Sequence, residues 1–508
     1  MSMPRVVLPL LNTKDFCIII MRNFVTCIFS LLLFVACSSA PKDVKCVDAL
    51  PDIYPDYIGV TIPAGIAPMN FNCADADVEC VDVVVKGSKG GSLHTNGDFA
   101  DFDIDDWHEI TNLNKGGELV FTVCMKRNGK WTQYNDFKMF VSNYPLDDYG
   151  LTYRKIAPGY EVYCKIGNYQ RNIHNFDEEP IIENTAVQGQ CMSCHTANQT
   201  NPEQFFFHLR GKHGCTLIQR GGKHVWYNAK TDSTIANPSY GYWHPSGRYC
   251  CFSVNKIHQC FFTGNKAMIE VFDTASDLVV LDVETSQLIL SPLLQGSESF
   301  ETYPVFSPDG RTMYFCVSKA YDMPREYDKA KYNLCKISFD PEKGVFGNKV
   351  DTVINAEKMN KSVTFPRPSY DGKYLMYCLS DFGNFPINHA EADLWMLDLR
   401  TNGSIELKNA NSPQSESYHN WSSNSHWFVT ASRREDTLYG LLYIASIDDN
   451  GNATKPFLLP QRNPQKFYHE SLFSYNVPDF TKSHVDFDVR KAYDEVYSDK
   501  RQRVTIKN

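Results

Sequence analysis

The residues Cys191, Met192, Ser193, Cys194 and His195 form the one strong chemical motif of this 508-residue chain. Their order, Cys-x-x-Cys-His, is the spacing of covalent c-type haem attachment. The two thiols can each add to a vinyl group of the porphyrin, and the adjacent imidazole then lies against the iron. The motif therefore predicts haem c held by Cys191 and Cys194, with His195 as the proximal iron ligand.

A second histidine, His208, follows thirteen residues after His195 and comes directly after three phenylalanines, Phe205 to Phe207. These rings could wall a haem and keep water from it, so we expect His208 to be the distal ligand; the alternative is an ordinary surface histidine. Two histidine ligands leave the iron no open position, which favours electron transfer over chemistry on oxygen or peroxide. The next candidates along the chain are His213 and His224.

Two other chemistries fit the same cysteines. The first is a zinc site, whose four ligands would come from the motif and one nearby side chain: Cys191, Cys194, His195 and one of His208, His213 or Cys215. The second is a disulfide between Cys191 and Cys194, which an oxidising compartment would allow. A thioredoxin-like redox site is disfavoured because no βαβ pattern surrounds the motif.

The N-terminus predicts export. Arg22 is followed by a short apolar run that ends in Ala36 and Cys37, the order of a bacterial signal with a lipobox. Cleavage before Cys37 and acylation of its sulfur would anchor the chain firmly, since two or three acyl chains are added. Met21 makes a better start than Met1, and no Asp follows Cys37 to signal retention in the inner membrane. We therefore expect an outer-membrane lipoprotein of the cell envelope, facing the periplasm or the exterior.

Composition limits the other classes of function. The formal net charge of −9 argues against a nucleic-acid-binding surface, which needs a clustered basic excess. No apolar run after residue 36 reaches the ~18 residues that cross a bilayer, so membrane attachment depends on the lipid. A length of 508 residues, 43% of them hydrophobic, allows two to four globular domains.

Residues 56–160 show short strand-like runs separated by glycine-containing turns, and no helical period. This pattern predicts an immunoglobulin-like β-sandwich of about 100 residues. The acidic run from Asp101 to Asp106 does not match a calcium-binding loop, because Asp106 stands where glycine is required. We expect it to be an acidic strand edge with Phe102 and Ile104 facing inward.

Residues 236–480 contain a repeat anchored on four turn residues: Gly247, Gly310, Gly372 and Ser425. An aromatic residue stands seven positions before each anchor, and an apolar strand follows each anchor. Small residues stand six positions after the anchors: Ser253, Cys316, Cys378 and Ala431. Each unit has room for four strands joined by tight turns, and a repeat of four strands is a β-propeller blade.

The segment from Ser307 to Arg311 reads Ser-Pro-Asp-Gly-Arg and, with its degenerate copies, resembles the repeats of TolB-like propellers. The resemblance implies five or six blades, with the outer ones drawn from residues near 206–235 and 450–480. The order of lipobox, β-rich domain, haem motif and TolB-like repeats also resembles a family of envelope lipoproteins of Gram-negative bacteria. In that family a His-x-Arg segment follows the haem motif, and His208-Leu209-Arg210 matches it.

The predicted protein is thus all-β: an immunoglobulin-like β-sandwich, a haem-motif segment and a TolB-like β-propeller. The predicted boundaries are a signal peptide at 1–36 (with 1–20 an extension), a lipidated tether at 37–55, the sandwich at 56–160, the haem-motif segment at 161–205, the propeller at 206–480 and a charged tail at 481–508.

Three functions compete. The first is a lipid-anchored haem protein that transfers electrons or senses redox state, with a protein or small-molecule partner at the propeller and no nucleic acid. The second is a binding scaffold in envelope assembly, with zinc or a disulfide at the motif. The third is a propeller enzyme, such as a hydrolase or lyase, with His244, His389 and His419 at one mouth.

Overall fold

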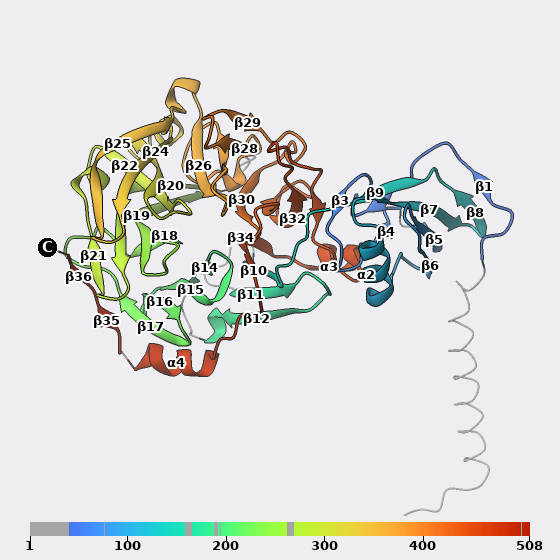
Figure 1. Ribbon diagram of the computed structural model, residues 1–508, viewed down its shortest axis with the longest axis horizontal. Helices are drawn as coiled ribbons and strands as arrows, with labels where there is room; N and C mark the ends of the chain where they lie inside the picture. Colours follow the sequence, from blue (N-terminus) through green and yellow to red (C-terminus); the bar gives the residue numbers. More distant parts are fainter. Residues whose placement is uncertain are drawn as a thin grey trace, which may run out of the picture.

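The computed structural model describes residues 40–75, 77–157, 165–186, 191–193, 195–261, 269–498 and 500–507. The predicted signal peptide, Cys37 and Cys194 lie outside these residues. The chain forms a small N-terminal domain beside a larger ring of β-sheets (Figure 1). Within the described residues, no helix is long and apolar enough to cross a bilayer.

The N-terminal domain is built on one sheet of seven strands: β1 (Lys45–Cys46), β3 (Thr61–Ile62), β5 (Cys80–Gly87), β6 (Ser92–Gly97), β7 (Glu118–Arg127), β8 (Lys130–Gln133) and β9 (Phe137–Val141). The strands β2 (Ile53–Tyr54) and β4 (Asn72–Cys73) form a separate pair. The central strands β5 and β7 are antiparallel, and Val83 lies opposite Val123 with both side chains buried. Alternate residues of these strands therefore supply the core of the domain.

The acidic run begins a helix, α2 (Ile104–Leu113), so the predicted acidic strand edge and the absence of any helix were wrong. The side chain of Asp103 accepts hydrogen bonds from the backbone amides of Asp105 and Asp106 at 2.9 and 3.2 Å. Such an N-cap satisfies amides that the helix leaves unpaired, and acidic residues in the first turn favour the helix dipole. Trp107 and Ile110 are buried on the inner face of the helix.

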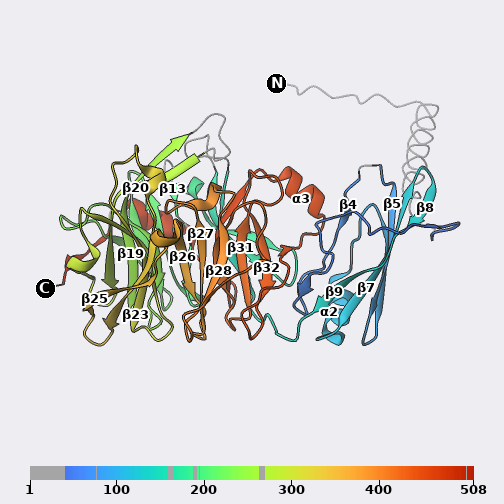
Figure 2. The ribbon, with the colours of Figure 1, turned by 90° about the horizontal axis from the view of Figure 1, so that it is seen from above.

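The ring contains a four-blade β-propeller arrangement, seen from a second side in Figure 2. In each blade four consecutive antiparallel strands follow one another in chain order: β18 (Pro238–Trp243), β19 (Tyr249–Phe261), β20 (Ile269–Asp282), β21 (Gln287–Ile289); β22 (Ser299–Phe306), β23 (Thr312–Lys319), β24 (Asn333–Asp340), β25 (Val345–Ile354); β26 (Ser362–Pro368), β27 (Tyr374–Ser380), β28 (Asp393–Asp398), β29 (Ser404–Glu406); β30 (Glu416–Trp421), β31 (Trp427–Ser432), β32 (Leu441–Ser446), β33 (Phe457–Leu458). The predicted all-β class and the propeller are confirmed.

The predicted turn residues occupy the first tight turn of each blade. The backbone φ angles are 70°, 71°, 74° and 62° at Gly247, Gly310, Gly372 and Ser425, in the left-handed region that glycine adopts without strain. In the third blade the Ser369 hydroxyl accepts from the backbone N–H of Tyr374 at 3.0 Å. The sequence repeat therefore reflects one backbone requirement of each blade, a residue in the left-handed conformation at the first turn.

Two further sheets lie in the ring between the fourth blade and the first. The closing sheet has the order β34 (Ser474–Thr481), β10 (Gly150–Ile156), β11 (Ile166–Asn172), β12 (Glu178–Glu183). The motif sheet consists of β13 (Cys191–Met192), β14 (Thr196–Asn198), β15 (Asn201–Arg210), β16 (Cys215–Arg220), β17 (Lys223–Asn228) and β35 (Gln502–Arg503). β34 contacts β30 on one side and β14 on the other, and β14 contacts β18. Strand β10, at the start of the segment that forms the ring, thus pairs in one sheet with β34, near the end of that segment.

The observed sheets divide the chain at other places than the predicted boundaries. β10 falls within the predicted sandwich, but it pairs with β34, with Leu151 opposite Phe480. The predicted tail contains α4 (Val489–Tyr497), whose Ala492 and Val496 are buried against the motif sheet. The shorter elements are α3 (Pro464–Glu470), β36 (Thr505–Ile506), and the 3-10 turns η1 (Asn184–Ala186), η2 (Pro292–Leu294), η3 (Tyr327–Lys329), η4 (Glu357–Met359) and η5 (Pro386–Asn388).

Candidate functional site

The described residues of the Cys-x-x-Cys-His motif, Cys191 to Ser193 and His195, lie at the edge of the motif sheet beside β15. Met192 pairs with Leu209 of β15. One residue further on, Ser193 and His208 exchange two hydrogen bonds: the Ser193 N–H donates to the His208 carbonyl at 2.9 Å, and the His208 N–H donates to the Ser193 hydroxyl at 2.8 Å. Backbone pairing therefore fixes the position of the motif against β15.

His195 is buried beside the closing sheet. Its Nδ1 lies 3.1 Å from the Thr152 hydroxyl of β10, while its Nε2 is buried and has no hydrogen-bond partner in the described part of the chain. The ring stacks at a tilt on Phe205, with 4.4 Å between ring centroids. Burial lowers the pKa of His195 to about 3, so the imidazole is neutral at neutral pH. A neutral imidazole with one nitrogen held and the other free is the form in which histidine binds metals.

His208 has the same arrangement. Its Nδ1 lies 2.8 Å from the Thr216 hydroxyl of β16, and its Nε2 is buried without a partner among the residues that the structure describes. Burial, with a smaller effect from the Arg210 charge, lowers the pKa of His208 to about 3. This ring is therefore also neutral and held by one nitrogen.

The structure places the two histidines on opposite faces of the motif sheet and does not bring them together. His195 packs on Phe205, whereas the ring of His208 contacts Phe206 and Phe252. Adjacent residues of a strand point to opposite faces, so Phe205 and Phe206 mark the two sides. His195 faces the closing sheet, and His208 faces the first blade.

Cys191 is half-buried, and its sulfur lies 3.9 Å from Nη2 of Arg154. Of the other predicted zinc ligands, His213 packs on Tyr497, and Cys215 lies on β16, which β15 separates from β13; burial raises the pKa of the Cys215 thiol to about 12. No group of three His, Cys, Asp or Glu side chains is placed to hold a metal ion among the described residues. Cys194 is not among them, so sites that need Cys194 stay predictions.

The histidines predicted for a propeller mouth lie at separate places. His244 is in the first turn of the first blade, where its Nε2 lies 3.0 Å from the Gly310 carbonyl. His389 follows η5, and its Nε2 lies 2.9 Å from Oε2 of Glu270, with both side chains buried. His419 is buried in β30, and burial lowers its pKa to about 3. The sequence did not signal the pairing of Glu270 with His389, which joins residues 119 positions apart.

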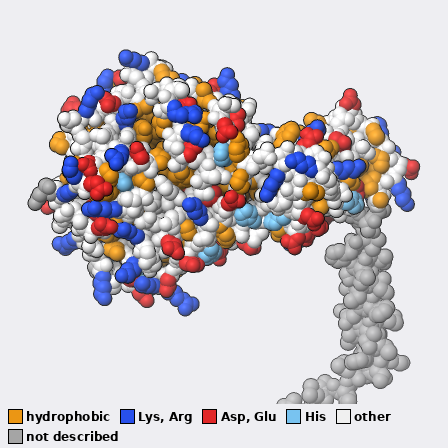
Figure 3. Space-filling view, in the orientation of Figure 1, with side chains coloured by type: hydrophobic (Ala, Val, Ile, Leu, Met, Phe, Trp, Pro, Cys, Tyr) orange, Lys and Arg blue, Asp and Glu red, His pale blue; other side chains and the backbone are white. Residues whose placement is uncertain are grey.

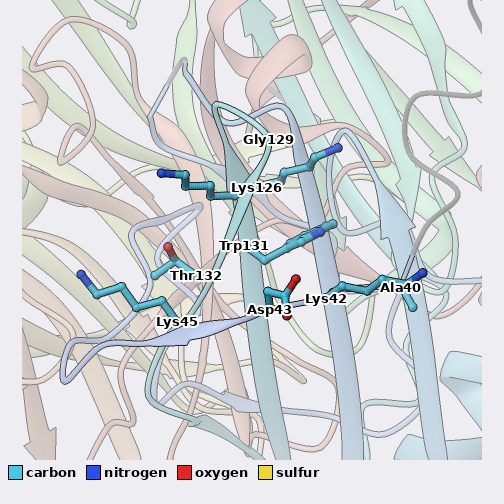
Figure 4. Close-up of a pocket in the computed structure, with 9 residues that line it drawn as sticks. Ala40, Lys42, Asp43, Lys45, Lys126, Gly129, Trp131 and Thr132 are labelled. Atoms are coloured by element: carbon cyan, nitrogen blue, oxygen red, sulfur yellow. The ribbon is translucent and has the colours of Figure 1, made fainter.

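The residues at the start of the described chain line a hollow of about 610 Å³ in the N-terminal domain (Figure 4). Four of the lining residues are lysines: Lys42, Lys45, Lys126 and Lys130. Asp43 is the one acidic residue of the lining, and Trp131 lies between the lysines in Figure 4. On the ring, by contrast, basic and acidic side chains are mixed over the face shown in Figure 3.

No family model matches the chain, and no curated protein matches it. Among solved structures, it is similar to a puromycin-hydrolyzing peptidase of Mycobacterium tuberculosis (TM-score 0.36, 11% identity, 80% of this chain and 57% of that one). It is also similar to prolyl oligopeptidase B of Galerina marginata (0.36, 10%, 62% and 45%) and to the β-propeller domain of the Trilobed protease of Pyrococcus furiosus (0.32, 9%, 69% and 96%). The chain spans about half the length of the two peptidases.

Proposed function

We propose that this chain is a lipid-anchored protein of the cell envelope that binds haem c covalently and transfers electrons or senses redox state. Cys191 and Cys194 would hold the haem and His195 would be its proximal ligand. One observation carries the proposal: within a Cys-x-x-Cys-His motif, the Nε2 atom of His195 is buried and has no hydrogen-bond partner among the described residues, while Thr152 holds Nδ1. A bound haem supplies an iron centre that accepts and releases one electron.

The surrounding residues suit that role. The Thr152 hydroxyl sets the orientation of the His195 ring, as groups behind a metal-binding histidine commonly do. Phe205 covers one face of the ring and Met192 is fully buried beside it in the sheet, so water is kept from this side of the motif. Burial of a haem site is one of the factors that set its reduction potential.

His208 is our candidate for the distal position. Its unpartnered Nε2 supports this role, whereas its place on the opposite face of the motif sheet counts against it. The His208→Ala variant decides between them: a distal ligand, when removed, converts a six-coordinate low-spin spectrum to a high-spin one, and a packing residue does not.

The lysine-lined hollow supports anchoring at a membrane surface through Cys37. It includes Ala40 and Lys42, which lie three and five residues after the predicted lipid attachment site. Lysines near a membrane anchor attract anionic lipid headgroups. Labelling with radioactive palmitate tests the anchor, and label that persists in Cys37→Ala would contradict it.

We also propose finer assignments of the fold. The ring would be a TolB-like propeller of six blades, since the closing and motif sheets stand beside the four regular ones and β34 contacts both neighbours. The N-terminal domain would be an immunoglobulin-like β-sandwich variant in which β2 and β4 form the smaller layer. The propeller would dock a protein or small-molecule partner.

The second candidate is an enzyme, such as a hydrolase or lyase, at the propeller mouth. The buried pair of Glu270 and His389 favours it, because such pairs serve as acid and base. The scaffold with zinc or a disulfide at the motif is the third. Both predict a protein without a visible absorption band.

The test is expression of the full chain with a c-type haem attachment system. We expect a Soret band that survives denaturation and extraction, because thioether bonds are covalent, and a pyridine haemochrome spectrum of c type. A purified protein with no Soret band and one equivalent of zinc would replace the haem proposal by the zinc scaffold.

A further inference from the structure

The hollow of about 610 Å³ in the N-terminal domain is lined by lysines from neighbouring strands of one sheet. Lys126 on β7 and Lys130 on β8 stand on either side of the turn that joins these two strands. Lys45 begins β1, which pairs in parallel with β8, and Lys42 precedes β1. In Figure 4 the labelled lysine side chains extend away from one another around Trp131. The positive charges are therefore spread over a surface.

These four lysines have no internal counter-charge, since no ion pair joins them to a carboxylate among the described residues. The adjacent Arg127, by contrast, pairs with Asp75 at 2.6 Å and with Asp77 at 3.1 Å. A single exposed lysine without a partner is ordinary, because water solvates its charge. Four lysines that line one hollow with a single acid, Asp43, instead give a local excess of positive charge, which attracts anions.

The hollow lies at the end of the molecule away from the ring. Strands β1 and β8 stand at that end of the N-terminal domain in both Figure 1 and Figure 2. Buried contacts hold the domain to the fourth blade: the Tyr57 hydroxyl donates to the Leu458 carbonyl at 3.1 Å, and β3 contacts β32. An interaction made at the far end of the domain therefore also sets the orientation of the ring.

The hollow also lies close to the predicted lipid attachment site. Its lining includes Ala40, three residues after Cys37, and three residues span at most about 10–11 Å. The charge of a membrane surface acts over a Debye length, which is about 10 Å at 0.1 M salt. A chain anchored at Cys37 would thus bring the lysines within reach of the leaflet that holds its acyl chains.

We propose that this lysine-lined hollow is a membrane-facing surface that binds the phosphate groups of anionic lipid headgroups and holds the ring away from the bilayer. Its place at a bilayer rests on the lipid anchor proposed above. The surface adds a second, electrostatic attachment to the acyl chains and fixes which end of the molecule meets the membrane. The motif sheet and the blades would then be open to partners from the aqueous side.

The arrangement of the lysines favours a bilayer over a single soluble anion. Sites for one phosphate commonly use converging backbone N–H groups or bidentate arginines. The described lining of the hollow contains no arginine, and its lysines extend apart. Lysine is a compact, strongly hydrated charge, which suits many headgroups that move within a plane. Trp131 is only 6% exposed, so the contact is with headgroups and not with the hydrocarbon interior.

The test is acetylation of the full chain on vesicles, with the extent at each lysine measured by mass spectrometry. One set of vesicles is phosphatidylcholine, and the other is phosphatidylcholine mixed with phosphatidylglycerol. We expect the four lysines of the hollow to react about threefold or more slowly on the anionic vesicles, because headgroups cover them. Lys358 and Lys408, exposed on the ring, should react equally on both. Salt at about 1 M should remove the difference, since the Debye length falls to about 3 Å.

A charge reversal tests the same surface from the other side. Lys126→Glu combined with Lys130→Glu should abolish the protection of Lys42 and Lys45 on anionic vesicles, because the hollow then repels the headgroups. Lys358→Glu combined with Lys408→Glu makes the same change of net charge on the ring and is the matched control, which should keep the protection. Thermal melts verify that both double variants are folded.

Three results would overturn the proposal: equal acetylation of the four lysines on both kinds of vesicle, equal protection of the ring lysines, or full protection by inorganic phosphate without vesicles, which would assign the hollow to a soluble anion. The lipid on Cys37 is measured separately, from the mass of its peptide. If that lipid is absent, the anchor is wrong but the surface is still tested, because excess anionic vesicles should protect the four lysines and phosphatidylcholine should not.

Discussion

The four regular blades and the motif sheet differ in how their innermost strand is built. In the second blade, β22 runs for eight residues, nearly all buried, with Tyr303 at φ 52° beside a bulge. In the motif sheet the corresponding edge is divided into β13 and β14, and His195 stands between them. The innermost strands of the regular blades are continuous, whereas the break in the motif sheet places His195 inside the ring.

The largest effect is expected from substitutions in the motif, where the innermost strand of the motif sheet is interrupted. Changing Cys191 and Cys194 together to Ala should abolish the Soret band, because both thioether bonds are lost. The absorption spectrum of the purified chain measures it, and Cys260→Ala, a half-buried cysteine of β19, is the control that should keep the full band. A Soret band from covalently bound haem in the double variant would show that haem is attached elsewhere, and the motif sheet would then not differ from the blades in its chemistry.

A regular blade should respond in stability and not in spectrum. Trp427 of β31 is fully buried, and its indole N–H donates to the Pro145 carbonyl at 3.1 Å. Trp427→Ala should lower the free energy of unfolding by about 3–5 kcal/mol, since a large cavity is left. Urea denaturation measures it, with the half-buried Trp395→Ala expected to cost clearly less. A shifted Soret maximum in Trp427→Ala would show that the two regions are not separate.

The junction between the two regions should make stability depend on pH. Asp479 of β34 accepts from the Ala197 N–H of the motif sheet at 3.1 Å, and burial raises its pKa to about 7. Because its folded-state pKa lies above the unfolded value near 4, the folded state binds more protons in between, and stability falls as pH rises through that window. Asp479→Asn should flatten this fall, which amounts to about 4 kcal/mol for a shift of about three pKa units.

Thermal melts at several values from pH 4 to pH 8 measure the difference. The exposed carboxylate of Asp381, which pairs with Lys361, is the control: Asp381→Asn should keep the wild-type slope. Parallel curves for wild type and Asp479→Asn would mean that Asp479 does not titrate in this range.

The smallest effect should separate the two histidines. Thr152→Val removes the group that holds His195, and Thr216→Val removes its counterpart at His208. Loss of a group behind a metal ligand typically lowers the affinity for the metal by about tenfold or more. We therefore expect that added imidazole displaces the proximal ligand of Thr152→Val at a concentration lower by about that factor. If Thr216→Val gives the same change, His208 is an iron ligand; if it gives none, His208 is a packing residue.

Much of the ring could be predicted because its repeat is local. A turn residue such as Gly310 and the strand after it lie within a dozen residues, and the same backbone need recurs in every blade. Helix α2 was missed because its signal is a cap, Asp103, on a helix of ten residues with only a few buried positions. The contact of His195 with Thr152, and the pairing of Leu151 with Phe480, join segments whose proximity follows only from the closed ring.

The closing sheet fixes an order of events for the nascent chain. Residues 150–183 leave the ribosome early, but the edge of β10 has no partner until Ser474–Thr481 arrives, some three hundred residues later. Until then a hydrogen-bonding edge stays open, which is a known route to mispairing. Cys191 and His195 are half-buried and buried in the finished ring, so the proposed attachment of haem would take place in the same interval, before the ring closes. If the motif is modified before the sheet closes, the pairing of β34 with β10 would then bury the modified residues inside the ring.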